Sequence, residues 1–69
     1  MFRLKWTDAE EIGFRLCQRF PDRDPLTVRF GDLRQWVGEL EEFDDSAKSN
    51  EGLLEAIQMA WLEAYRQGR

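Results

Sequence analysis

The side chains best suited to chemistry are carboxylates, and they are gathered in one short stretch. Residues 36 to 45 read WVGELEEFDD, in which five of the last seven residues are acidic. The pattern predicts a helix over this stretch, which places the acids at its C-terminal end. A helix carries about half a negative charge at that end, so each acid costs roughly 0.3 to 1 kcal/mol. Folding alone does not favour this arrangement, which indicates a function.

Carboxylate clusters support two kinds of binding. Oxygen-only ligand sets suit hard cations such as calcium, magnesium or ferrous iron, and flexible, partly hydrated sets bind them weakly. The same acids could meet an Arg- and Lys-rich groove on a partner protein, with fast and salt-sensitive association. A simpler interpretation is that they only solvate an exposed face. The candidate metal ligands are Glu39, Glu42, Asp44 and Asp45.

Two further acids start the last predicted helix. The connector before it is only six residues long, so we expect Glu51 and Glu55 to lie close to Glu39 and Glu42. Glu51 and Glu55 also repel each other at i,i+4 spacing, which costs a few tenths of a kcal/mol. Carboxylates gathered on one side of the molecule repel one another and destabilise the fold, so we predict that they form a partner-binding surface. Its predicted members are Glu39, Glu41, Glu42, Asp44, Asp45, Glu51 and Glu55.

Catalysis and nucleic-acid binding are disfavoured by composition. The chain has no His, one Cys and dispersed glycines, so it offers neither an activated nucleophile nor a phosphate-binding loop. We predict a protein that is not an enzyme, has no catalytic residue and requires no cofactor. The formal charge is −4, and residues 38 to 69 hold eight acids against three bases. Such a surface repels DNA and anionic lipid, although a DNA-binding winged helix stays a lesser alternative.

Periodic apolar residues predict three amphipathic helices. The first helix follows a capping signal formed by Thr7 and Glu10 and ends at Pro21. The second starts at Gly31-Asp32 and frays near Phe43, and the third starts after Ser49 or Asn50. Their apolar faces are Ala9, Ile12, Gly13, Leu16, Cys17 and Phe20; Leu33, Trp36, Val37 and Leu40; and Leu53, Leu54, Ile57, Ala60, Trp61, Ala64 and Tyr65.

A semi-extended insert separates the first two helices. Asp24-Pro25 favours one short helical turn, and Val28 and Phe30 then alternate with Arg29 as in a strand. The expected fold is therefore an all-α, three-helix domain that spans residues 1–69 as a single unit. The first residues lack the apolar core of a signal peptide, and the single Cys suits a reducing compartment, so we expect a cytoplasmic monomer without membrane contact.

An ordered set of short motifs resembles the IscX proteins of bacterial iron-sulfur cluster assembly. The set covers nearly the whole chain and is more specific than any one of its parts. It comprises Lys5-Trp6-Thr7-Asp8, Asp24-Pro25 with Thr27-Val28-Arg29-Phe30, Gln35-Trp36, Leu40-Glu41 with Phe43-Asp44-Asp45, Ser49-Asn50-Glu51, Leu54-Glu55-Ala56-Ile57 and Trp61-Leu62.

The resemblance implies a modified winged-helix domain that binds the cysteine desulfurase of the assembly system through its acidic surface. It further implies modulation of the desulfurase and weak ferrous iron binding. An alternative within the same system is an iron donor that delivers Fe²⁺ to the assembly machinery. The chain departs from the family pattern at Ser46-Ala47, where relatives carry a further Asp and a Pro, and at Arg66 and Arg69, where relatives tend to be acidic.

Overall fold

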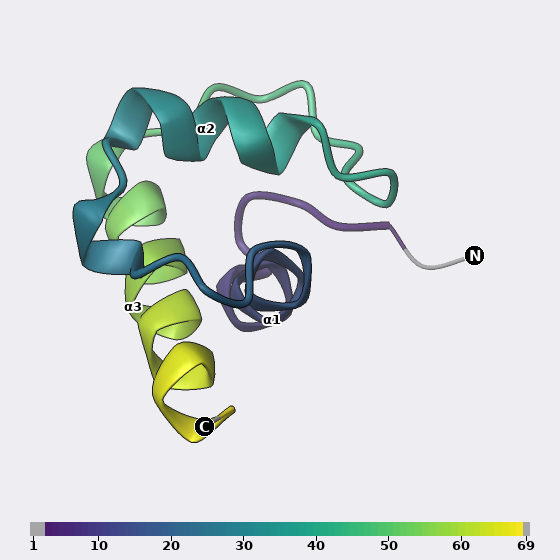
Figure 1. Ribbon diagram of the computed structural model, residues 1–69. Helices are drawn as coiled ribbons and strands as arrows, with labels where there is room; N and C mark the ends of the chain where they lie inside the picture. The colour runs from purple at the N-terminus through teal and green to yellow at the C-terminus, as the bar shows by residue number, and fades with distance from the viewer. Residues whose placement is uncertain (1–2, 69) are drawn as a thin grey trace.

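The computed structural model describes residues 3–68. These residues form three α-helices and one 3-10 turn, which confirms the predicted all-α, three-helix fold. Helix α1 packs mainly against α3, while α2 lies across them (Figure 1). Over the described part of the chain, no helix is long and apolar enough to cross a bilayer. The elements are α1 (Ala9–Arg19), η1 (Pro25–Thr27), α2 (Phe30–Gly38) and α3 (Glu51–Gln67).

The starts of the helices agree only partly with the predicted caps. The Asn50 side chain accepts a hydrogen bond from the Leu53 N–H at 2.8 Å, as expected for the start of α3. The predicted capping box of Thr7 and Glu10 is wrong, because Thr7 is not the N-cap residue. Helix α1 begins at Ala9, and Asp8 is its N-cap residue. The Asp8 carboxylate does not cap the helix and instead accepts the Lys5 N–H at 2.9 Å.

The insert has the predicted short helical turn and extended Val28, but Phe30, predicted as extended, is the first residue of α2. Asp24 precedes η1 in an extended conformation, and its carboxylate accepts the Leu26 N–H at 3.0 Å. Val28 follows in an extended conformation and is buried. Gln58 of α3 donates from Nε2 to the Pro25 carbonyl at 3.0 Å, which ties the insert to the last helix. The insert therefore covers one side of the core.

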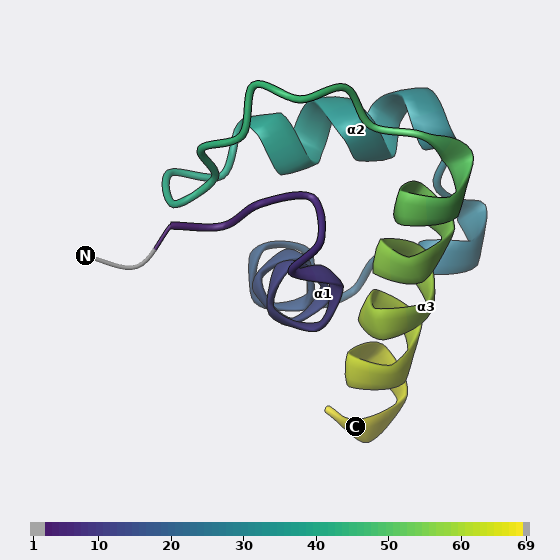
Figure 2. The ribbon, with the colours of Figure 1, turned by 180° about the vertical axis from the view of Figure 1, so that it is seen from behind.

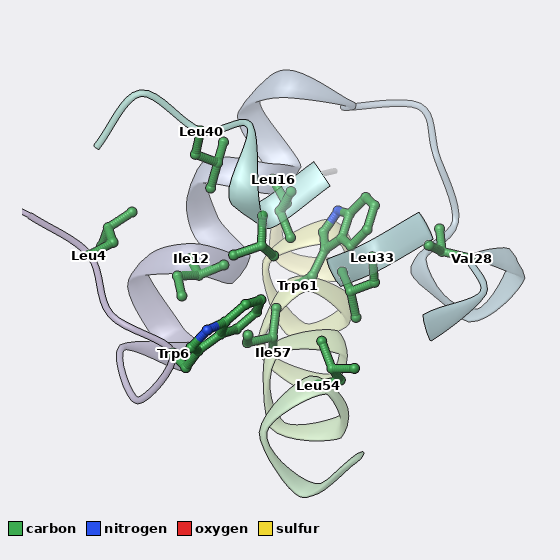
Figure 3. Packing of buried hydrophobic residues seen from close by; sticks show 11 residues of the cluster. Leu4, Trp6, Ile12, Leu16, Val28, Leu33, Leu40, Leu54, Ile57 and Trp61 are labelled. Atoms are coloured by element: carbon green, nitrogen blue, oxygen red, sulfur yellow. The ribbon is translucent and has the colours of Figure 1, made fainter. Parts of the chain in front are cut away.

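The three predicted apolar faces meet in one core (Figure 3). Ile12 and Leu16, Leu33 and Val37, and Ile57 and Trp61 are all buried. Four core residues were absent from the predicted helical faces, namely Leu4 and Trp6 in the segment before α1, Val28 in the insert and Leu62 of α3. The free thiol of Cys17 is half-buried and packs against this cluster, which agrees with its predicted packing role. The aromatic part of the core contains Phe20 stacked on Trp36, with ring centroids 4.7 Å apart.

Helices α1 and α3 cross at a glycine. A Cβ atom on Gly13 would lie 2.5 Å from the Trp61 backbone nitrogen and 2.7 Å from the Ala60 carbonyl carbon. Real Cβ atoms do not approach backbone atoms so closely, so only glycine allows this contact. The crossing places Trp61 at the centre of the core, where it is fully buried.

Helix α2 is shorter than predicted. It ends at Gly38, and Glu39 is its C-cap residue, so the acids from Glu41 onward lie beyond the helix. The chain then turns twice, through hydrogen bonds from the Leu40 N–H to Val37 and from the Phe43 N–H to Leu40. A helix continued to Phe43 would hold several carboxylates against its negative end, and the turns avoid this cost.

Candidate partner-binding surface

The acidic stretch forms a tip, residues 39–45, against which the start of the chain is docked. Leu4 pairs with Phe43 in a parallel bridge. The Leu4 N–H donates to the Glu42 carbonyl at 2.7 Å, and the Asp44 N–H donates to the Leu4 carbonyl at 2.9 Å. The rings of Trp6 and Phe43 meet edge to face, with centroids 4.7 Å apart. The N-terminal segment, residues 3–6, thus fixes the position of the acidic tip.

Asp45 serves this docking directly. Its carboxylate accepts the Trp6 N–H at 3.0 Å and the Ala47 N–H at 2.9 Å. Hydrogen bonds to these two backbone groups lower the pKa of Asp45, because they stabilise the charged form, and the nearby charge of Lys5 adds to the effect. The indole of Trp6 also donates to the Ala47 carbonyl at 2.8 Å. Asp45 therefore has a structural role.

Two further acids of the tip are paired with arginines. Glu42 accepts from Nη1 of Arg15 at 2.9 Å, and Asp44 forms an ion pair with Arg3. Arg15 also bonds Glu11 of its own helix at 2.9 Å, and this hydrogen bond is the main reason why the pKa of Arg15 is raised. Glu42 is therefore only partly exposed, and its charge is paired within the chain. These pairs join the tip to α1 and to the N-terminal segment.

Glu39 and Glu41 differ from their neighbours. Both are exposed, and among residues 3–68 neither forms an ion pair. Glu39 accepts only a long hydrogen bond from Nε2 of Gln35, at 3.3 Å. Their charge is therefore available to a partner, while the positions of both residues are set by the turns after α2.

Glu51 and Glu55 lie elsewhere. The connector of residues 44–50 runs back along the whole length of α2 before α3 begins (Figure 2). Glu51 consequently borders a hollow with Phe30 and Arg34 at the start of α2. The prediction that the connector brings this end of α3 close to Glu39 and Glu42 is therefore wrong, because Glu51 lies at the start of α2 and Glu39 lies at its end. Glu55 follows Glu51 one turn further along α3. The acidic residues form two separate surfaces.

The predicted metal ligands are not gathered into one preformed site. Over residues 3–68, no three His, Cys, Asp or Glu side chains are grouped so that they could hold a metal ion. Asp45 is engaged with two backbone N–H groups, and Glu42 and Asp44 are engaged with arginines. Ferrous iron binding by Glu39, Glu42, Asp44 and Asp45 stays a prediction.

Sequence reasoning missed the residues that position the tip. Arg3 and Arg15 neutralise two of its acids, and Leu4 and Trp6 anchor it to the core. A signal for the second pair is present, since residues 3–6 alternate polar and apolar side chains with the period of an extended strand. The arginines have no such signal, because their partners lie 27 to 41 positions along the chain.

The chain matches known proteins over most of its length. A family described as iron-sulphur cluster assembly matches residues 4–66. The chain is also 56% identical over 61 residues to an uncharacterized protein of Pseudomonas aeruginosa, with 87% of this chain and 92% of that protein covered. The family match contains residues 4–6 of the N-terminal segment, the acidic tip and all the helices except the last residue of α3. The resemblance drawn from the motifs is thereby confirmed, and the chain belongs to the IscX family of iron-sulphur cluster assembly proteins.

Proposed function

We propose that this protein binds the cysteine desulfurase of the iron-sulphur assembly system through its acidic tip and modulates its activity. Membership of an assembly family supports a role in this system. The observation that carries the proposal is that Glu39 and Glu41 are both exposed and have no ionic partner among residues 3–68. Glu39 is the C-cap residue of α2, where negative charge opposes the helix dipole, and Glu41 lies in the turn that follows. In this role the protein is a cytoplasmic, monomeric adaptor with no catalytic residue and no required cofactor.

The shape of the acidic tip is already set before a basic partner binds. Backbone hydrogen bonds to Leu4 and the bonds to Asp45 hold its chain in place. A preformed surface loses little conformational freedom on association, so more of its interaction energy appears as affinity. Charges at the edge of an interface mainly raise the association rate and give it a strong salt dependence. Docking of this kind would hold the adaptor near the desulfurase without any chemistry of its own.

The test is to measure desulfurase binding by calorimetry at low and at high salt, for the wild type and for Glu39→Lys with Glu41→Lys. We expect the reversed charges to abolish most of the affinity at low salt, and high salt to weaken the wild type strongly. Both side chains are exposed and neither has an ionic partner in the described chain, so the variant should fold.

A matched control is available on the second acidic surface. Glu51→Lys with Glu55→Lys changes the net charge by the same amount, at exposed positions near the start of α3. We expect this control to retain most of the affinity. Equal losses in the two variants would mean that net charge alone drives binding, and unchanged affinity in the tip variant would refute the proposed surface.

Delivery of ferrous iron is the second candidate, and the same carboxylates would carry it. Anaerobic calorimetry with Fe²⁺ separates the two, because delivery requires iron occupancy at cellular concentrations and docking does not. The engagement of Asp45 and the ion pairs of Glu42 and Asp44 favour docking over delivery, since an iron ion would have to displace these contacts.

A further inference from the structure

A surface hollow lies between the start of α1 and residues 56–67 of α3. It is an open groove of about 490 Å³, separate from the acidic tip. Its lining consists of Ala9, Glu10, Ala56, Met59, Ala60, Glu63, Ala64 and Gln67. None of these residues belongs to the surface assigned above to the desulfurase.

The floor of the groove is apolar and shallow. Alanines from both helices form it, and small side chains let another chain approach the helix backbones closely. Met59 stands beside them with 53% of its surface exposed. Methionine is flexible and polarisable, so it adapts to apolar side chains of different shapes. This stripe of α3 is therefore suited to an apolar face that the described chain does not provide.

The rim of the groove is acidic. Glu10 borders it from α1 and Glu63 from α3, and both are exposed. Glu55 and Glu63 lie one helical turn to either side of Met59, on the same face of α3. The one base on this face of α3 is Arg66, at i+7 from Met59. An occupant thus meets an apolar centre with carboxylates around it.

We infer that this groove binds a basic amphipathic helix of a partner protein, whose apolar residues cover Met59 and the alanines. Lys or Arg side chains beside that apolar stripe would pair with Glu10 and Glu63. The lining of α3 extends from Ala56 to Gln67, about 16 Å, which matches three turns of a docked helix. A second copy of this chain is a poor occupant, because each copy carries a formal charge of −4.

The probe for the test is a capped, alanine-rich peptide of about 14 residues, with leucines at i and i+4 spacing and lysines on both sides of them. NMR of the protein with ¹³C-labelled methionine methyl groups would follow the peptide titration. We expect the Met59 methyl signal to shift and to saturate. Met59→Ser should weaken binding without unfolding the protein, because the side chain is already half exposed.

Two double variants, each of which removes two negative charges, locate the binding site of the peptide. Glu10→Gln with Glu63→Gln removes two charges from the rim, and Glu39→Gln with Glu41→Gln removes two from the tip. We expect the rim variant to weaken peptide binding by about five-fold and the tip variant to leave it unchanged. Circular dichroism checks that both variants keep their helices.

Three outcomes would overturn the inference. One is the absence of a saturable Met59 shift, and another is equal weakening by the rim and tip variants, which would indicate unspecific attraction. The third is a dimer in sedimentation equilibrium that Met59→Ser dissociates, because the groove would then be occupied by a second copy. Since the tip variant tests the desulfurase surface separately, failure here leaves the proposed function standing.

Discussion

The crossing of α1 and α3 and the docking of the N-terminal segment on the acidic tip hold the molecule together in different ways. The crossing is apolar and closed, with backbone atoms so near Gly13 that no side chain fits. The docking depends on backbone hydrogen bonds, the carboxylate of Asp45 and the ion pair of Arg3 with Asp44. A second ion pair joins Glu42 of the tip to Arg15 of α1. Close packing tolerates almost no change in volume, whereas polar contacts near the surface can be replaced by water.

This difference separates the acids of the tip into two groups. Asp45, Glu42 and Asp44 contribute to the fold, because each is bonded to another part of the chain. Glu39 and Glu41 make no comparable contact and remain exposed. The tip is thus a surface in which fixed acids hold the shape and free acids supply the charge.

The largest effect should come from closing the space at the crossing. Gly13→Ala should destabilise the protein by about 1 to 3 kcal/mol, because its new Cβ meets backbone atoms and α1 must move away from α3. Urea unfolding followed by circular dichroism measures this. The gain of about 0.5 to 1 kcal/mol that alanine brings to a helix opposes the effect without cancelling it.

Gly31→Ala is the matched control. Gly31 lies in α2, and no atom comes within 4 Å of a Cβ placed there. This substitution should leave stability unchanged or raise it. Equal behaviour of the two variants would show that the crossing is not closed as described.

A smaller loss is expected at the polar contact. Asp45→Ala removes the acceptor of two backbone N–H groups and should lower stability, though less than Gly13→Ala, since water can reach the released groups. Glu41→Ala, at an exposed position of the same tip, should have almost no effect. Urea unfolding of both variants makes the comparison, and equal losses would remove the structural role assigned to Asp45.

The Asp45 contribution should also depend on pH. Its pKa is lower in the folded protein than in the unfolded chain, so the stabilisation is fully present above about pH 4. It is lost as the pH falls further, through the lowered pKa of the folded state. The stability difference between wild type and Asp45→Ala should therefore shrink in strong acid, as urea unfolding over a pH series would show. A difference that stays constant down to the lowest pH would contradict this.

The ion pair between Arg15 and Glu42 should contribute least. Both side chains are partly exposed, at 27% and 37%, so solvent screens their attraction. A double-mutant cycle with Arg15→Gln and Glu42→Gln should give a small favourable coupling that disappears at high salt. A coupling that persists at high salt would mean that the pair is more enclosed than its exposure indicates.

The sequence predicted the helices well because each has a local signature. The apolar period around Ile12 and Leu16, the Asp24-Pro25 turn and the Asn50 cap depend on neighbours within a few residues. The capping box failed for a local reason, since a turn in which Lys5 and Asp8 bond each other precedes α1, and the helix starts at Ala9. The docking of Leu4 and Trp6 was missed because it joins segments about 40 positions apart.

The candidate site was only partly predictable for the same reason. Composition located the acids of residues 39–45, but which of them are free depends on where Arg3 and Arg15 lie in space. The predicted position of Glu51 near Glu39 and Glu42 was wrong, because a short connector limits how far the chain can travel but does not set the direction in which it runs. The connector runs back along α2, so nearness in sequence did not produce nearness in the fold (Figures 1 and 2).

The separation of free from fixed acids is tested most directly by one double variant, Glu39→Gln with Glu41→Gln, measured for stability and for desulfurase affinity together. Stability should be unchanged or slightly higher, because removing a charge at the C-cap of α2 relieves about 0.3 to 1 kcal/mol of unfavourable interaction. Affinity at low salt should fall roughly two- to thirty-fold. Unchanged affinity, or a loss that only accompanies unfolding, would contradict the account.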